Sequence, residues 1–272
     1  MTLRIITGAA LLALLFFALY FGGWVFSLLW IACVCIALHE LFNALKNAGH
    51  HVLAWPTWFA LIIAIPGFLL LTEVENLLLL VILVAVIIFV IITLIMFRDD
   101  PSLDDLMTSI IPLFAVALPG MSLLGMTRIE PVGLQRVMLS LAFFIPVVGD
   151  SLAFFVGSKY GKTKLNKAIS PNKTIEGSLG GLVGSILAAV VIYFIGLLAG
   201  TNVPTVINFI VLGLLGGIAG QIGDLFASFV KRHCGIKDYS HIFPGHGGMM
   251  DRLDSILFAG TLVYFYQALP WI

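Results

Sequence analysis

Hydrophobic residues occur in long blocks along this chain, and short polar or glycine-containing segments separate the blocks. The block from Leu77 to Phe97 contains neither a charged residue nor a proline. A helix needs about 20 apolar residues to cross the hydrocarbon layer of a bilayer, where it satisfies its own backbone hydrogen bonds. The pattern therefore predicts an all-α integral membrane protein.

Glycine pairs, prolines and charge clusters divide the chain into about nine predicted spans. Arg4 precedes the first apolar run, which lacks a small-residue cleavage site, so we expect a retained helix rather than a signal peptide. Gly22–Gly23 alone separates the first two spans, which indicates a tight hairpin or one interrupted element. The predicted spans are Ile5–Phe21, Trp24–Leu45, Pro56–Leu71, Asn76–Phe97, Leu106–Leu124, Gln135–Gly157, Gly177–Ala199, Pro204–Val230 and Leu253–Leu269.

Composition and charge placement agree with this prediction. Hydrophobic residues make up 61% of the chain and charged residues 10%, whereas soluble domains carry about 25% charged residues. With nine spans and a cytoplasmic N-terminus, all but two of the 14 Lys and Arg residues, Arg128 and Arg136, fall on the cytoplasmic side. We therefore expect an inner-membrane protein with its C-terminus in the periplasm.

The polar residues favour a division into two regions. Residues 1–134 hold about five predicted spans with short connections. Residues 135–272 hold the remaining spans and two cytoplasmic loops, 158–176, which has five lysines, and 231–251, which mixes Lys, His, Asp, Gly and Pro. We expect the second region to be catalytic.

Four acidic residues fall within or at the start of predicted spans: Glu40, Asp150, Asp224 and Asp251. A charge within a bilayer is costly and marks a functional site by default. Asp150 and Asp224 each precede the cytoplasmic end of a span by about two helical turns. We expect both to face a polar cavity in the cytoplasmic half of the membrane.

The segment Ser228–Asp254 combines cations, acids and a glycine-rich turn. Exposed backbone N–H groups in such a turn, followed by a helix start, favour an anion such as phosphate. Magnesium is usually held by one or two carboxylates together with substrate phosphates. The segment therefore predicts a site for a metal–polyphosphate substrate, with positive charge from Lys231, Arg232 and Lys237 and metal-binding oxygens from Asp224, Asp251 and Asp254.

Each of these features has a simpler alternative. Lys231 and Arg232 could be membrane-interface anchors, and Asp251 with Asp254 could cap the last helix. The basic loop 158–176 could clamp phosphates or lie on anionic lipid headgroups. The glycines that open two later spans could serve close helix packing or backbone approach to a ligand. The sequence does not favour a zinc site, because no compact His or Cys pair has ligand spacing.

The same segment resembles the signature of the phosphatidate cytidylyltransferases, also called CDP-diacylglycerol synthases. The region Asp150–Gly181 is similar to a second conserved block of this family, although Phe155 stands where Tyr is common and Ile175 where Trp is common. The signature positions that match are Ser228, Lys231, Arg232, Lys237, Asp238, Ser240, Pro244, His246, Gly247, Gly248, Asp251, Arg252 and Asp254.

This resemblance implies transfer of CMP from CTP to phosphatidate, giving CDP-diacylglycerol and pyrophosphate with Mg²⁺ as cofactor. It implies metal ligands at Asp224 and Asp251, with Asp150, Glu176 and Asp254 as further candidate ligands, and it allows for a second metal ion. The implied catalytic residues are Lys231, Arg232, Lys237, Asp238, His246 and Arg252. The implied phosphate-binding residues are Lys159, Lys162, Ser170, Lys173, Thr174, Ser228, Gly247 and Gly248.

The resemblance further implies membrane lipid as a partner, a homodimer, and no nucleic-acid partner. Two rival functions are open to a chain of this kind. Another CTP-dependent lipid enzyme, such as a polyprenol kinase or an archaeal CDP-lipid synthase, would lack the full signature. An ion- or proton-coupled transporter would show inverted repeats and midplane sites, whereas the acids here cluster with cytoplasmic loops.

Overall fold

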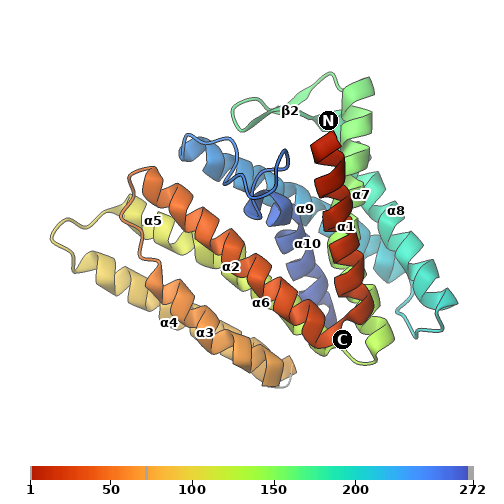
Figure 1. Ribbon diagram of the computed structural model, residues 1–272, viewed down its shortest axis with the longest axis horizontal. Helices are drawn as coiled ribbons and strands as arrows, with labels where there is room; N and C mark the ends of the chain where they lie inside the picture. The colour runs from red at the N-terminus through yellow and green to blue at the C-terminus, as the bar shows by residue number, and fades with distance from the viewer. Residues whose placement is uncertain (1, 71–72, 269–272) are drawn as a thin grey trace.

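A computed structural model describes residues 2–70 and 73–268 of the chain (Figure 1). The predicted span ends Leu71 and Leu269 lie outside these residues. The described residues are mostly helical. The elements are α1 (Thr2–Phe21), α2 (Gly23–Asn47), α3 (Trp55–Leu70), α4 (Glu73–Met96), α5 (Leu103–Pro112), η1 (Leu113–Ala117), α6 (Leu118–Gly125), η2 (Met126–Arg128), α7 (Val132–Tyr160), β1 (Lys164–Asn166), β2 (Ser170–Thr174), α8 (Ile175–Leu198), α9 (Val206–His233) and α10 (Met250–Ala268).

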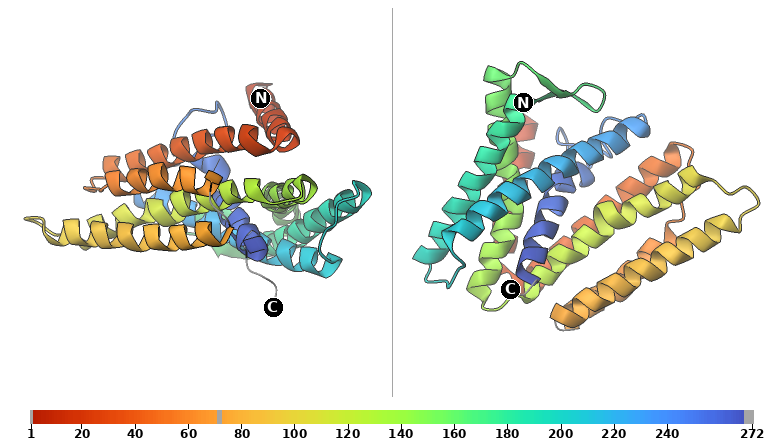
Figure 2. Two further views of the ribbon diagram at one scale, coloured as in Figure 1. Left: turned by 90° about the horizontal axis from the view of Figure 1, so that it is seen from below. Right: turned by 180° about the vertical axis from the view of Figure 1, so that it is seen from behind.

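Six of the described helical segments are long and apolar enough to cross a membrane. The helix α10 is not among them, because its first turns carry Asp251, Arg252 and Asp254. It packs against α9, α7, α6 and α2, and most of its side chains are buried. Figure 2 shows α7, α8 and α9 together on one side and the α3–α4 pair on the other. The count of nine spans and the orientation of the termini stay predictions.

The break between α1 and α2 lies at the predicted glycine pair. Gly22 and Gly23 have φ angles of 58° and 43°, a left-handed conformation that residues with a Cβ rarely adopt. The chain therefore reverses sharply between the two helices (Figure 1). Consequently, the N-terminal half of α1 lies at the same end of the molecule as the last residues of α2.

Glycines also bring the later helices close together, as the packing alternative predicted. A Cβ built on Gly181 of α8 would lie 3.1 Å from the backbone oxygen of Gly149 in α7. A Cβ built on Gly213 of α9 would lie 2.7 Å from the Cα of Ile186 in α8. These contacts confirm that the glycines allow near backbone-to-backbone packing of α7, α8 and α9.

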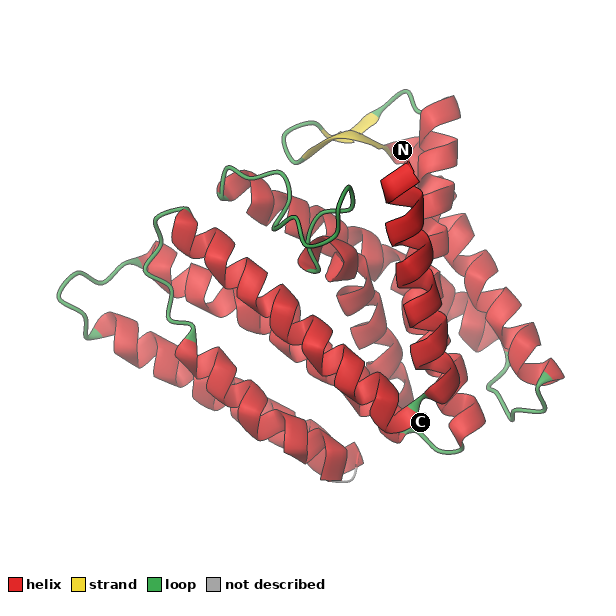
Figure 3. Cartoon of the chain, viewed as in Figure 1, coloured by secondary structure: helices red, strands yellow, loops and turns green. Residues whose placement is uncertain are grey.

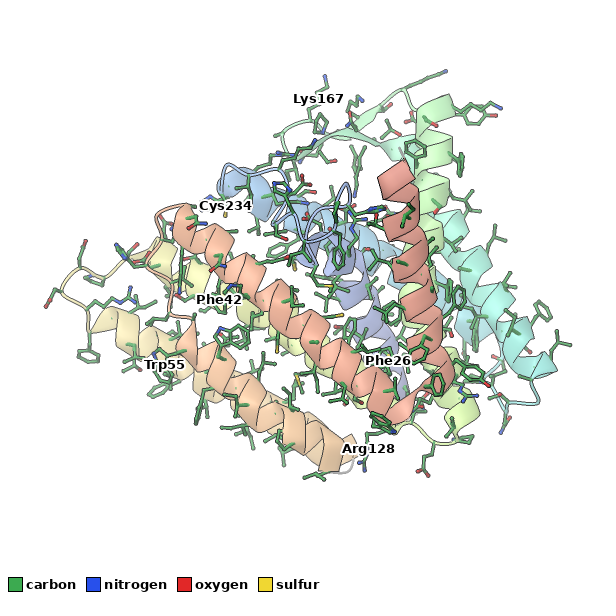
Figure 4. The ribbon with its side chains drawn as sticks, in the orientation of Figure 1. Phe26, Phe42, Trp55, Arg128, Lys167 and Cys234 are labelled. Atoms are coloured by element: carbon green, nitrogen blue, oxygen red, sulfur yellow. The ribbon has the colours of Figure 1, made fainter. Side chains whose placement is uncertain are left out.

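The loop 158–176 contains a short antiparallel ribbon that the sequence did not predict. Strands β1 and β2 pair Lys164 with Thr174 and Asn166 with Ser170. Figure 3 shows the ribbon and the long connection between α9 and α10 at the same end of the molecule. Lys167 and Cys234 also lie at that end, whereas Arg128 lies at the opposite end (Figure 4). The polar candidate residues therefore gather at one end of the helical bundle.

We expect Gly223→Ala to destabilise the fold. A Cβ at this position of α9 would overlap the backbone oxygen of Asp254 and lie 2.8 Å from Cδ2 of Phe258. Because α10 cannot withdraw its backbone locally, the two helices must separate, at a cost of about 1–3 kcal/mol. Thermal unfolding in detergent should show a lower midpoint. Gly216→Ala is the matched control, since its Cβ would meet only the side chain of Ile145 at 3.3 Å. Equal midpoints for the two variants would contradict the expectation.

Candidate active site

A cavity of about 550 Å³ opens between α7, the β-ribbon, α8 and α9. Its polar lining includes Asp150 from α7, Lys173 and Thr174 from β2, Ser178 from α8 and Asp224 from α9. Its size is in the range of ligand-binding pockets. The structure thus brings the two intramembrane acids of the second region together with residues of the predicted phosphate-binding loop.

Opposite charges face one another in this cavity. Lys173 and Asp224 form an ion pair between β2 and α9. The Ser228 hydroxyl, one turn further along α9, donates to Asp224 Oδ1 at 3.5 Å. Asp150 and Asp254 lie close enough to Asp224 for electrostatic repulsion among the three carboxylates. Lys173, Lys231 and Arg252 partly offset this repulsion, and a bound cation would offset it further.

The donor set fits a magnesium ion that is shared with a polyphosphate. Within residues 2–70 and 73–268, no three His, Cys, Asp or Glu side chains form a group that could hold a metal ion by themselves. Magnesium bound with a polyphosphate needs only one or two carboxylates, because phosphate oxygens and water complete its octahedron. Asp224, with Asp150 and Asp254 beside it, offers such carboxylates.

Asp251 is engaged differently from Asp224. Its Oδ1 accepts a hydrogen bond from Lys231 Nζ at 2.7 Å, and its Oδ2 accepts from the backbone N–H groups of Tyr239 and Gly248, both at 2.9 Å. The Lys231 and Asp251 side chains are only 11% and 3% exposed. Asp251 therefore joins the end of α9, the following loop and the start of α10.

Tyr239 lies beneath this ion pair, and sequence reasoning gave it no role. Its hydroxyl donates to the backbone oxygen of Ala227 at 3.1 Å, and Lys231 Nζ lies 5.5 Å from its ring centroid. Burial, together with the negative charge of Asp251, raises the pKa of the Tyr239 hydroxyl. The phenol therefore stays protonated and acts as a donor that anchors the loop to α9.

Glu40 is the second acid that holds this loop. Its side chain is 4% exposed, and its carboxylate accepts hydrogen bonds from Ser240 Oγ and from the backbone N–H groups of Met249 and Met250. The sequence marked Glu40 as an acid within a span but assigned it no role. Its partners could not be identified from the sequence because they lie about 200 positions away.

His246 contacts the first helix rather than the cavity lining. Its Nδ1 lies 2.8 Å from Thr7 Oγ1, which also donates to the backbone oxygen of Pro244 at 3.4 Å. The Gly247 φ angle of 85° places a tight turn after His246. A Cβ at Gly247 would lie 2.9 Å from Asp251 Oδ2, so the turn and the acid approach closely. No sequence signal pointed to Thr7.

The remaining candidates lie around these clusters. Arg232 is exposed and donates to the backbone oxygens of Ile169 and Ile236, so it connects the ribbon with the loop after α9. Glu176 accepts from the backbone N–H groups of Lys162 and Thr163, which fixes the start of the ribbon. The other predicted residues are exposed or half-buried at the same end and do not line the cavity: Lys159, Lys162, Ser170, Lys237, Asp238 and Arg252.

The fold and the site define a helical, membrane-type protein with a charged cavity suited to a phosphate-bearing ligand. The chain belongs to the cytidylyltransferase family, whose model matches residues 2–269.

Individual relatives carry a more specific name. The chain is 42% identical over 144 residues to a phosphatidate cytidylyltransferase of Bacillus subtilis (strain 168), covering 52% of each protein. It is 40% identical over 154 residues to one of Staphylococcus aureus (strain COL), covering 56% of each. It is 33% identical over 151 residues to one of Thermotoga maritima, covering 49% of this chain and 56% of the relative. The matched region spans about half the length of these relatives.

Proposed function

We propose that this protein is a magnesium-dependent phosphatidate cytidylyltransferase, which transfers CMP from CTP to phosphatidate and releases pyrophosphate. The observation that carries the proposal is the cavity in which Lys173 and Asp224 pair beside Asp150, since it combines phosphate-binding and metal-binding groups. The family membership and the names of the relatives support the same reaction.

The proposed chemistry requires positioning more than proton transfer. An oxygen of the phosphatidate phosphate attacks the α-phosphorus of CTP, a new P–O bond forms, and the bond to the β-phosphate breaks as pyrophosphate leaves. Because the nucleophile is already an anion, no strong general base is needed. The rate then depends on alignment of the two substrates and on neutralisation of their charge.

Residues of this chain can supply both effects. Lys173 reaches into the cavity from β2, and Thr174 lies beside it, so this ribbon can bind phosphate oxygens. The cations Lys231, Arg232, Lys237 and Arg252, which lie outside the cavity lining, would orient the remaining phosphates. The Gly247 and Gly248 N–H groups would bind phosphate only by leaving their present acceptors, Phe243 O and Asp251 Oδ2. Asp224, with Asp150 or Asp254, would hold Mg²⁺, which supplies positive charge to the triphosphate. Asp251 would become a further metal ligand only if its carboxylate gave up the contact with Lys231.

The setting follows from the apolar helices and the charge distribution. We propose a multi-pass inner-membrane protein with the cavity on the cytoplasmic side, where CTP is available and where most lysines lie. Phosphatidate would keep its acyl chains in the bilayer while its phosphate enters the cavity at the headgroup plane. A homodimer is proposed from the family resemblance alone, and the mass of the protein in detergent micelles tests it.

The proposed reaction is tested with purified protein in detergent, phosphatidate, Mg²⁺ and CTP labelled at either the α- or the γ-phosphate. Lipid-extractable label from α-labelled CTP, together with an equal amount of pyrophosphate, is the expected result. Lipid label from γ-labelled CTP would identify a lipid kinase instead. Absence of lipid label from both nucleotides, at any Mg²⁺ concentration, would also overturn the proposal.

A further inference from the structure

Glu40 is a buried acid of the N-terminal region whose described hydrogen bonds go to the connection between α9 and α10 and to the first residue of α10. Its donors are the Ser240 hydroxyl and the N–H groups of Met249, at 3.1 Å, and Met250, at 2.8 Å. The side chain is 4% exposed, so water contributes little to its solvation. A buried carboxylate is costly unless donors surround it. These donors therefore explain how an acid is tolerated within an apolar helix.

The position of the carboxylate matches a helix N-terminus. The first N–H groups of a helix lack partners within the helix, and a negative charge there interacts favourably with the helix dipole. Here the cap comes from α2 rather than from the residue that precedes α10. Glu40 thus replaces a local cap with a tertiary contact, and α10 can start only where α2 places this carboxylate.

The fit between Glu40 and the loop leaves no space for another side chain. A Cβ at Gly248 would lie 2.6 Å from Glu40 Oε2 and 2.8 Å from Cδ. The N–H group of the same glycine donates to Asp251 on its other side. The segment Gly248–Met250 is therefore held between two carboxylates, Glu40 from α2 and Asp251 from α10.

These contacts connect Glu40 with the residues of the proposed site. The first turn of α10 carries Asp251, which pairs with Lys231, and leads into Asp254 beside Asp224. A shift of this turn would move both the Lys231–Asp251 ion pair and the Asp254 carboxylate. The Ser240 hydroxyl donates to the same Glu40 carboxylate, so an earlier part of the loop is held by Glu40 as well.

We infer that Glu40 is a positioning residue for the cytidylyl-transfer site, so that α2 is part of the site's scaffold as well as a membrane helix. This inference rests on the proposed function. It assigns to the first region of the chain a role in catalysis that acts through the loop Ser240–Met250. Glu40 itself is not among the residues that line the cavity.

The test compares Glu40→Gln, Glu40→Asp and the matched variant Ser240→Ala in detergent-purified protein. Glu40→Gln keeps the size of the side chain but turns an acceptor into a donor opposite an N–H group. We expect kcat to be at least about 10-fold lower, because a hydrogen bond to a charged group contributes a free energy that corresponds to roughly a 10-fold change or more. Glu40→Asp should retain part of the rate, and Ser240→Ala, which removes one of the three donors, should lose less than Glu40→Gln.

Hydrogen–deuterium exchange supplies a readout that does not require activity. In Glu40→Gln, the amides of residues 240–250 should exchange at least about 10-fold faster, while those of α8 keep their wild-type rates. Acceleration spread evenly along the chain would show a general structural role and overturn the inference, as would unchanged exchange with unchanged kcat. Wild-type protein that fails to transfer CMP would overturn the proposed function alone, because the exchange experiment would still decide the role of Glu40.

Discussion

Asp224→Asn should lower the rate of CMP transfer by about 100-fold or more while the protein remains folded. The substitution keeps the shape of the side chain but removes the charge that pairs with Lys173 across the cavity. It also removes the carboxylate best placed to hold Mg²⁺ beside Asp150. Loss of one electrostatic contact in an active site typically costs 100- to 1,000-fold in kcat. Initial rates with labelled CTP, at saturating phosphatidate, measure the effect.

The control for Asp224→Asn is Asp99→Asn, an equal loss of charge at an exposed position outside the cavity. This variant should transfer CMP at the wild-type rate. A Mg²⁺ titration of both proteins adds a second measurement, because the Asp224→Asn protein should need more Mg²⁺ for half-maximal rate. Wild-type turnover and an unchanged Mg²⁺ requirement in Asp224→Asn would remove Asp224 from the site.

Lys231→Met should be the most destabilising single substitution among the charged residues in the last turn of α9 and the loop that follows it. It leaves the Asp251 carboxylate, 3% exposed, with two backbone donors but without its cation. Removing one partner of a buried ion pair typically costs about 3–5 kcal/mol. Thermal or detergent-induced unfolding should therefore show a much lower midpoint than the wild type. Activity should be lost as well, because the pair joins α9 to the first turn of α10.

A double variant separates the stability that comes from the ion pair from the stability that each of its two residues contributes. In Lys231→Met with Asp251→Asn, no uncompensated charge remains, so the loss of stability should be smaller than the sum of the two single losses. Lys237→Met is the matched control, because Lys237 is exposed and its replacement should change stability by less than about 0.5 kcal/mol. Additive losses in the double variant would contradict a coupled buried pair.

Helix positions were the part of the fold most accessible to prediction. The predicted spans and the observed helices agree closely, from Ile5–Phe21 against α1 to Pro204–Val230 against α9. Apolar runs and glycine breaks act locally, so they can be recognised without knowledge of tertiary contacts. The β-ribbon was not predicted, because its strands of three and five residues are too short for a recognisable alternation.

The candidate site was predicted in composition but not in arrangement. The residues Asp224 and Lys173 were both expected to contact substrate or metal, and the structure pairs them across one cavity. Asp251 was expected to bind metal in the same way, yet its carboxylate is directed toward Lys231 and two backbone donors. The two aspartates therefore have different surroundings, and the sequence motif alone cannot distinguish them.

By itself, the sequence determined that this is a helical protein built for a membrane and that its polar chemistry is concentrated in residues 150–181 and 228–254. Both conclusions depend on local runs of residues, which specify hydrophobicity and motif directly. Only the tertiary structure decided that Glu40 caps α10, that Thr7 contacts His246 and that three acids meet beside Lys173. These interactions join residues from 30 to more than 200 positions apart, and their geometry depends on how the helices pack.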